Sequence, residues 1–261
     1  MGQGIPLIIL HGLYGSSDNW LAIARSLSAN FRVIVPDLRN HGRSSHNPEH
    51  TYQSMVADVL ELMDEQTIEQ CILLGHSMGG KMALHLANTA PHRISKLVII
   101  DIAPLDYTSY TTYAPLVLEH MNIADTLLYT DLKLYNRRED IERAWMKNIP
   151  EPATRRFLLK NIQRLKNNTY CWKINIRVIL QNLPHILNGM DEFDIDSPMK
   201  HPVLFVRGEH SPYIQPEVFP LIFQTFPDSQ IVTIPQSGHW LHVEQPKIFL
   251  EKVSLFLSLP G

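Results

Sequence analysis

Residues 71–80 read CILLGHSMGG, and residues 81–87 continue with KMALHLA. The apolar run predicts a short buried strand, and the segment after it predicts a helix. Between them lies the pattern G-x-S-x-G, in which a serine sits at the tip of a sharp strand-to-helix turn. Ser77 would be that serine, and Gly75 and Gly79 fit because strand and helix pass too close there for a Cβ atom. The stretch therefore predicts a nucleophilic serine on an α/β fold.

The same residues also resemble a nucleotide-binding loop. From Gly75 to Lys81 the chain matches G-x-x-x-x-G-K between a strand and a helix, as a phosphate-binding loop requires. That motif continues with a serine or threonine whose hydroxyl binds Mg²⁺, and here the next residue is Met82. The missing hydroxyl argues against nucleotide binding.

Composition is that of an ordinary globular enzyme. The 261 residues, 44% hydrophobic and 19% charged, fit one domain with or without an inserted cap. A net charge of −3 without a basic run argues against nucleic acid as a partner. No segment approaches the roughly 20 apolar residues of a membrane span, and Cys71 and Cys171 are most simply free thiols. We therefore expect a cytoplasmic protein, monomeric or homodimeric, that acts on a small molecule and uses no metal or cofactor.

Strand-like and helix-like segments alternate along the chain. Continuous apolar runs bounded by Gly, Pro or polar residues predict parallel strands buried on both faces. The alternation predicts a mostly parallel sheet flanked by helices, with the site at the carboxyl ends of the strands. The predicted strands are residues 7–10, 31–35, 71–75, 97–100, 203–206 and 230–234, and the predicted core helices include residues 18–27, 51–65 and 246–257.

The chain between Pro104 and Pro202 has a different pattern. It shows helical spacing and no run of the buried-strand type, apart from a short extended piece at residues 170–174. We interpret residues 104–201 as a helical cap inserted over the sheet edge, and residues 1–103 and 202–261 as the core of a single structural domain. The predicted cap helices are residues 114–129, 139–148, 154–165 and 176–187.

A serine nucleophile needs a base to take its proton and an acid to orient that base. His239 follows the last predicted strand in a glycine-containing loop, and we assign it as the base. The acid usually follows the preceding strand, but Ser211 in that loop cannot balance an imidazolium. Asp101 ends a neighbouring strand and could reach the same histidine, so we favour it, with Glu209 as the alternative.

Backbone amides would stabilise the oxyanion of the reaction. A second turn, HGLYGSS at residues 11–17, leaves the first strand with the pattern H-G-x-x-G, which supplies an N–H near the nucleophile. We assign the two donors to Leu13 and Met78, the latter at the positive end of the helix that follows the serine. Tyr14 and Trp240 are expected to contact the substrate.

Two further polar groups have structural interpretations. The loop at residues 37–42, DLRNHG, is turn-rich, and we expect it to brace neighbouring loops by hydrogen bonds. His76 flanks the serine and is expected to point away from the site.

Five segments together resemble the YbfF-type bacterial esterases of the α/β-hydrolase superfamily. The resemblance implies the α/β-hydrolase fold, hydrolysis of simple carboxylic esters or acyl-CoA thioesters, and a triad acid that corresponds to Asp101. The family carries two strands before the one at residues 7–10, so we expect either that leading strands of the sheet are missing or that the start of the chain is misassigned. The five segments are residues 37–42 (DLRNHG), 75–81 (GHSMGGK), 100–107 (IDIAPLDY), 211–213 (SPY) and 238–242 (GHWLH).

The sequence therefore predicts a carboxylesterase that cleaves small esters or acyl thioesters through Ser77, His239, Asp101 and an acyl-enzyme. Dehalogenases and epoxide hydrolases of this fold need an aspartate nucleophile, which Ser77 does not supply. A carbon–carbon bond hydrolase, a perhydrolase and a catalytically idle ligand-binding protein would keep the serine and are the alternatives.

Overall fold

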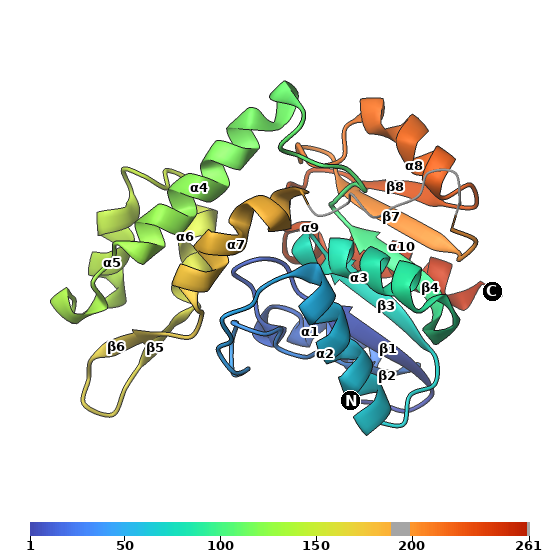
Figure 1. Ribbon diagram of the computed structural model, residues 1–261, viewed down its shortest axis with the longest axis horizontal. Helices are drawn as coiled ribbons and strands as arrows, with labels where there is room; N and C mark the ends of the chain where they lie inside the picture. Colours follow the sequence, from blue (N-terminus) through green and yellow to red (C-terminus); the bar gives the residue numbers. More distant parts are fainter. Residues whose placement is uncertain (189–198, 260–261) are drawn as a thin grey trace.

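The computed structural model describes residues 1–188 and 199–259. In these residues six parallel strands form one sheet in the order β2-β1-β3-β4-β7-β8 (Figure 1). Every predicted strand is confirmed, and residues 1–4 add no strand to the sheet. The strands are β1 (Ile5–Leu10), β2 (Phe31–Ile34), β3 (Cys71–His76), β4 (Ile94–Ile100), β7 (Val203–Gly208) and β8 (Gln230–Ile234).

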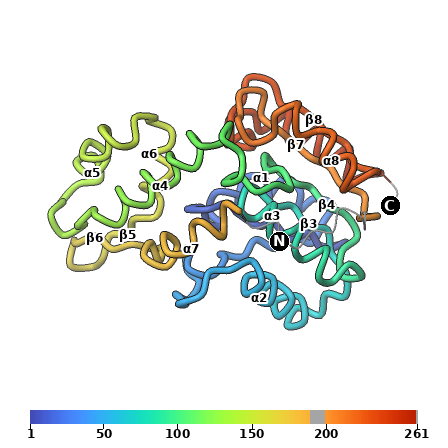
Figure 2. The backbone as a smooth tube through the Cα atoms, turned by 45° about the horizontal axis from the view of Figure 1, so that its top comes forward, coloured from blue at the N-terminus to red at the C-terminus, as the bar shows by residue number. Residues whose placement is uncertain are grey.

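Helices cover both faces of the sheet (Figures 1 and 2). Alternate side chains of a strand enter different apolar clusters: Ile8 belongs to one cluster and Ile9 to the other. Burial on both faces explains why the strands read as continuous apolar runs. The helices of this core are α1 (Leu21–Leu27), α2 (Tyr52–Glu65), α3 (Met78–Thr89), α8 (Phe219–Thr225), α9 (Leu241–Glu244) and α10 (Pro246–Ser258), with short 3-10 turns η1 (Ser17–Asn19), η2 (Pro91–Arg93) and η5 (Pro216–Val218).

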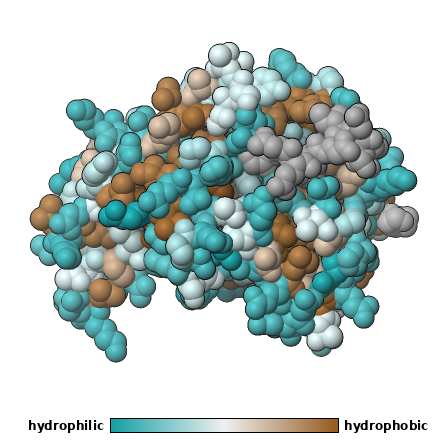
Figure 3. Space-filling view, in the orientation of Figure 1, coloured by the Kyte–Doolittle hydropathy of each residue, from teal (hydrophilic) through white to brown (hydrophobic). Residues whose placement is uncertain are grey.

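Between β4 and β7 the chain leaves the sheet and forms the lobe at the left of Figure 1. We call residues 111–188 the inserted segment; residues 189–198 of the expected cap lie outside the described residues. Figure 3 shows brown apolar and teal polar surface mixed over this lobe. The segment contains η3 (Thr111–Tyr113), α4 (Ala114–Leu128), η4 (Leu132–Leu134), α5 (Arg138–Trp145), α6 (Pro152–Leu159), the antiparallel hairpin of β5 (Ile162–Arg164) and β6 (Tyr170–Trp172), and α7 (Ile176–Asn188).

One predicted helix is wrong at its end. Apolar spacing predicts a helix over residues 154–165, but α6 ends at Leu159 and the chain continues into the β5 strand. Asn161 explains the change of direction. Its side chain donates to the Tyr14 carbonyl (2.7 Å) and its own carbonyl accepts from the Lys173 amide (2.8 Å), so it serves tertiary contacts instead of the helix.

Lys81, the lysine of the phosphate-loop-like pattern, is almost fully buried and holds the end of α7. Its ammonium donates to the carbonyls of Leu187 (2.7 Å) and Asn188 (2.5 Å). The Tyr52 hydroxyl donates to the carbonyl of Ile186 (2.9 Å) in the same turn. A cation at a helix C-terminus satisfies carbonyls that lack intrahelical partners and opposes the negative end of the helix dipole. Lys81 therefore joins the inserted segment to α3.

Two buried imidazoles fasten the turn after β1 to the loop at residues 37–45. Nε2 of His11 accepts from the Leu38 amide (2.9 Å), and Nε2 of His41 accepts from the Tyr14 amide (3.3 Å). In each ring Nδ1 faces a backbone carbonyl, which makes Nδ1 the protonated nitrogen and leaves Nε2 free to accept. These contacts confirm the bracing role that the sequence predicts for this loop.

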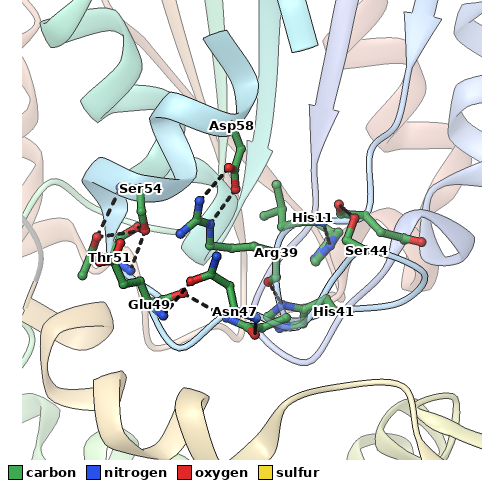
Figure 4. Close-up of polar contacts among 12 residues, drawn as sticks. His11, Arg39, His41, Ser44, Asn47, Glu49, Thr51, Ser54 and Asp58 are labelled. Carbon is green, nitrogen blue, oxygen red and sulfur yellow. Dashed lines mark hydrogen bonds and ion pairs between the residues drawn. The ribbon is translucent and has the colours of Figure 1, made fainter. Parts of the chain in front are cut away.

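The loop is in turn anchored to two other parts of the molecule. Arg39 donates to both carboxylate oxygens of Asp58 on α2, at 2.6 Å each (Figure 4). Asn40 accepts from the side chain (3.1 Å) and amide (2.9 Å) of Asn175, immediately before α7. The loop thus touches the turn after β1, the core helix α2 and the inserted segment at once.

The close packing around α3 predicts the effect of one methyl group. A Cβ at Gly79 would lie 2.3 Å from the Leu10 carbonyl oxygen and 2.7 Å from that of His11, both backbone atoms that cannot rotate away. We expect Gly79→Ala to lower the free energy of unfolding by at least about 3 kcal/mol. At Gly238 the nearest atom would be 3.7 Å away, so Gly238→Ala should change it by less than about 1 kcal/mol. Equal urea midpoints would contradict this account.

Burial of His50 predicts sensitivity to acid. Both ring nitrogens lack a partner among the described residues, and burial, assisted by the Arg39 charge, lowers the pKa to about 4. The unfolded chain, with an ordinary pKa near 6.5, binds the proton first, so stability is lost as pH falls below 6.5. Between pH 7.5 and 5.5 wild type should lose about 1.4 kcal/mol more than His50→Phe in urea unfolding. An identical loss of stability in both proteins would show that His50 binds its proton as readily in the folded as in the unfolded chain.

Candidate active site

Ser77 stands at the turn between β3 and α3 in a strained backbone conformation, with φ 52° and ψ −120°. Such angles are uncommon for a residue with a side chain and persist only where the surroundings enforce them. Here a Cβ at Gly75 would lie 2.2 Å from the Gly79 carbonyl oxygen, which confirms the close approach of strand and helix. The Ser77 amide donates to the Ile100 carbonyl (2.9 Å), so the turn is also tied to β4.

Two backbone amides beside the serine make no hydrogen bond to the described residues. Within the described ranges, no acceptor faces the N–H of Leu13 or that of Met78, the first residue of α3. The turn that carries Leu13 presses against the serine, because a Cβ at Gly12 would lie 3.2 Å from the Ser77 Cβ. Free amides at a helix start are suited to bind a negatively charged oxygen.

His239 and Asp101 come together from distant parts of the chain. Asp101 follows β4 with φ 51° and is fully buried, and His239 follows β8. Nδ1 of the histidine donates to the Asp101 carboxylate at 2.7 Å. Burial lowers the pKa of His239, so the ring is neutral near pH 7 and its Nε2 can accept a proton.

The Asp101 carboxylate has two further donors. The amide of Gly208, the last residue of β7, donates to it (3.0 Å), as does the Ser211 hydroxyl from the loop that follows; β7 is the strand next to β4 in the sheet. Burial raises the pKa of Asp101, and these two hydrogen bonds oppose the rise because they stabilise the ionised form. Ser211 is not the acid itself, but its hydroxyl stabilises the ionised carboxylate of Asp101. The adjacency of the two strand ends was the only signal in the sequence for this contact.

Glu209, the alternative acid, makes a different contact. Its carboxylate is exposed and accepts from the Gln236 amide at 2.7 Å. The hydrogen bond to the His239 ring is made by Asp101 instead.

His76 lies in the site, and the expectation that it points away is wrong. Its ring centroid is 4.5 Å from that of His239, and its Nε2 donates to the His239 carbonyl at 2.9 Å. Tyr213 stacks on the His239 ring, with ring centroids 4.0 Å apart and ring planes 20° apart. The Tyr213 hydroxyl in turn bonds to Nε2 of His120 on α4 (2.7 Å). The His239 ring is therefore packed against Tyr213 and His76 and, through Tyr213, linked to the inserted segment.

One cavity of about 220 Å³ joins these groups. Ser77 and His239 both line it, although no hydrogen bond links their side chains in the part of the chain that the structure describes. Tyr14 and Trp240, the two residues expected to contact substrate, line it as well. The remaining lining residues are Leu13, His76, Leu116, Glu119, His120, Ile123, Glu151, Thr154, Phe157, Leu158, Pro212 and Tyr213.

Residues 1–188 and 199–259 hold no group of three or more His, Cys, Asp or Glu side chains that could bind a metal ion. In the same ranges no helix has the length and apolar character needed to cross a bilayer.

Known proteins resemble this chain over almost its whole length. A family model described as alpha/beta hydrolase fold matches residues 5–246. The sn-1-specific diacylglycerol lipase ABHD11 of Danio rerio is 35% identical over 98% of this chain and 80% of its own length. Esterase YbfF of Escherichia coli is 32% identical over 97% of this chain and 93% of its own length.

A solved structure agrees with these relatives. The protein titled "Marine microorganism esterase" superposes with a TM-score of 0.91 and 44% identity, covering 98% of this chain and 96% of that one. Sequence, fold and the strained serine turn thus lead to one family. The chain belongs to the α/β-hydrolase fold family, among the YbfF-like esterases.

Proposed function

We propose that this protein is a serine carboxylesterase in which Ser77, His239 and Asp101 form the catalytic triad. One observation carries the proposal: a serine on a strained turn shares an apolar cavity with a neutral imidazole that is held by a buried carboxylate. Relatives named as esterases and as a diacylglycerol lipase support ester hydrolysis as the reaction.

The residues would act in two steps. Nε2 of His239 takes the Ser77 proton as the oxygen attacks the acyl carbon, and the amides of Leu13 and Met78 stabilise the oxyanion. The imidazolium then protonates the departing alcohol, which leaves an acyl-enzyme. Water, activated by the same imidazole, attacks that ester and releases the acid and the free serine. Nδ1 of His239 keeps its proton throughout and donates a hydrogen bond to Asp101, which fixes the ring orientation.

The step from Ser77 to His239 requires a contact that forms with substrate. Both side chains line the cavity without a direct hydrogen bond, and catalytic hydrogen bonds are often long in free enzymes and shorten in the substrate complex. Tyr213 and His76 pack against the His239 ring and hold it in place. The strained turn then has to bring the Ser77 hydroxyl to that ring.

The surroundings of the site suggest further roles. We propose that residues 104–201 act as a cap, because seven residues of α4 and α6 line the cavity. Tyr14 and Trp240 would contact the acyl or alcohol group of the substrate. Both cysteines are free thiols, which agrees with a cytoplasmic protein.

Removal of the serine oxygen tests the nucleophile. We expect Ser77→Ala to reduce kcat for para-nitrophenyl butyrate by at least about 10⁴-fold, because no other group can form the acyl-enzyme. Wild type should also be labelled by a fluorophosphonate and the variant should not. Labelling without turnover would instead indicate an idle ligand-binding protein, and turnover by the variant would exclude Ser77 as the nucleophile.

A pair of carboxamide variants tests the acid. Asp101→Asn keeps the side-chain shape but removes the charge that orients and balances the His239 ring, so kcat should fall by about 10⁴-fold. Glu209→Gln changes an exposed carboxylate without a contact to that ring and should retain wild-type kcat. Circular dichroism checks that both variants fold. The reverse pattern of activities would make Glu209 the acid.

A further inference from the structure

Tyr213 contacts the proposed base and also reaches the inserted segment. Its ring lies flat on the imidazole of His239, with centroids 4.0 Å apart and planes 20° apart. Its hydroxyl and Nε2 of His120, on α4, form a hydrogen bond of 2.7 Å. All three residues line the cavity that holds Ser77. One side chain thus connects the base to a helix from a distant part of the chain.

The backbone of Tyr213 is fixed to the segment that follows the acid. Its carbonyl accepts from the Tyr107 hydroxyl (2.8 Å), and that hydroxyl accepts from the amide of Ala103 (2.8 Å), just after Asp101. Ser211, in the same loop as Tyr213, donates to the Asp101 carboxylate. The loop after β7 therefore holds both the acid and the aromatic ring against which the base lies.

Asp101 and Tyr213 restrain the His239 ring in two different ways. The hydrogen bond from Nδ1 to Asp101 (2.7 Å) fixes the direction of the ring within its plane, and the stack on Tyr213 fixes the plane itself. Together they set where Nε2 lies relative to Ser77. The stack also favours the imidazolium that the proposed reaction creates, because a cation over the face of an aromatic ring is attracted by its π electrons.

His120 connects this arrangement to α4. Burial lowers its pKa to about 4, so the ring is neutral near pH 7 and its bond to the Tyr213 hydroxyl joins two uncharged groups. Its backbone carbonyl also accepts from the Tyr14 hydroxyl, at the longer distance of 3.5 Å. Two tyrosines from loops of the core thus reach one residue of α4. The position of that helix is therefore linked to the Tyr213 ring.

We infer that Tyr213 is a positioning residue of the reaction, which holds His239 for proton transfer and couples it to the inserted segment through His120. This inference rests on the proposed function and deepens it. Acylation and deacylation both use the base, so a displaced His239 slows both steps without weakening substrate binding. The inserted segment thus contributes to turnover as well as to the cavity wall.

Removal of the hydroxyl and of the whole ring tests the role of Tyr213. Tyr213→Phe keeps the stack on His239 but breaks the bond to His120. We expect it to lower kcat for para-nitrophenyl butyrate by about fivefold to tenfold, with KM within about twofold of wild type. Tyr213→Leu also removes the stack and should lower kcat by at least about 30-fold. A residue that only lined the cavity would raise KM instead.

Tyr52→Phe is the matched control. Tyr52 also stacks on a histidine, His85, with centroids 4.8 Å and planes 19° apart, and its hydroxyl also binds the inserted segment, at the Ile186 carbonyl (2.9 Å). It does not line the cavity. Its kcat should therefore stay within about twofold of wild type. An equal fall in kcat for Tyr52→Phe and Tyr213→Phe would show a general fastening effect and overturn the inference.

Variants of His120 test the coupling. His120→Leu should cost as much kcat as Tyr213→Phe, and the double variant no more than either, because both remove the same bond. His120→Gln, whose amide offers a donor and an acceptor, should recover most of the loss. Circular dichroism checks that all variants fold.

The outcomes separate the inference from the proposed function. Costs that multiply in the double variant, or a Tyr213→Phe enzyme with wild-type kcat, would overturn the inference, while hydrolysis by wild type upheld the proposed function. A Tyr213→Phe enzyme with raised KM and unchanged kcat would do the same. Failure of wild type to hydrolyse the ester would overturn both.

Discussion

The close contact between β3, α3 and the end of β1 is the constraint on which the site depends. Only glycine fits at residues 75 and 79, because an added Cβ would lie within 2.3 Å of a backbone oxygen at either position. This packing leaves Ser77 in a left-handed conformation and turns the first amide of α3 toward the same space. The energy stored in the turn is balanced by the core on both faces of the sheet. Reactivity at one residue thus depends on the stability of the whole domain.

Much of the fold follows from the sequence, because strands buried on both faces leave long apolar runs and chain order fixes the site residues. Asp101 could be favoured for the same reason: the carboxyl ends of neighbouring parallel strands meet at one edge. The end of α6 could not be predicted, since Asn161 leaves the helix to bind a loop almost 150 residues earlier in the chain, and that contact has no local signal. The same holds for His76 and Ser211, whose partners lie in the loops that follow other strands.

Neutral imidazoles are a common theme of this molecule. His11 holds the Leu38 amide and His41 holds the Tyr14 amide, and His76 holds the backbone of the loop that carries His239. Each ring connects two backbone segments by hydrogen bonds, and burial keeps it uncharged. The exclusion of water that stabilises these contacts also strengthens the interaction of the amide dipoles with a developing oxyanion. The hydrogen bonds that hold the loops and the proposed reaction therefore both depend on the exclusion of water from the site.

The buried ammonium of Lys81 has a consequence for recombining this protein with its relatives. It is held by carbonyls at the end of α7, so a chimera that received another hydrolase's segment between β4 and β7 would leave the charge without those acceptors. A buried cation that loses its partners costs several kcal/mol. A chimera that exchanges this segment therefore has to exchange residue 81 as well. The part that can be transplanted is larger than the stretch of chain that covers the cavity.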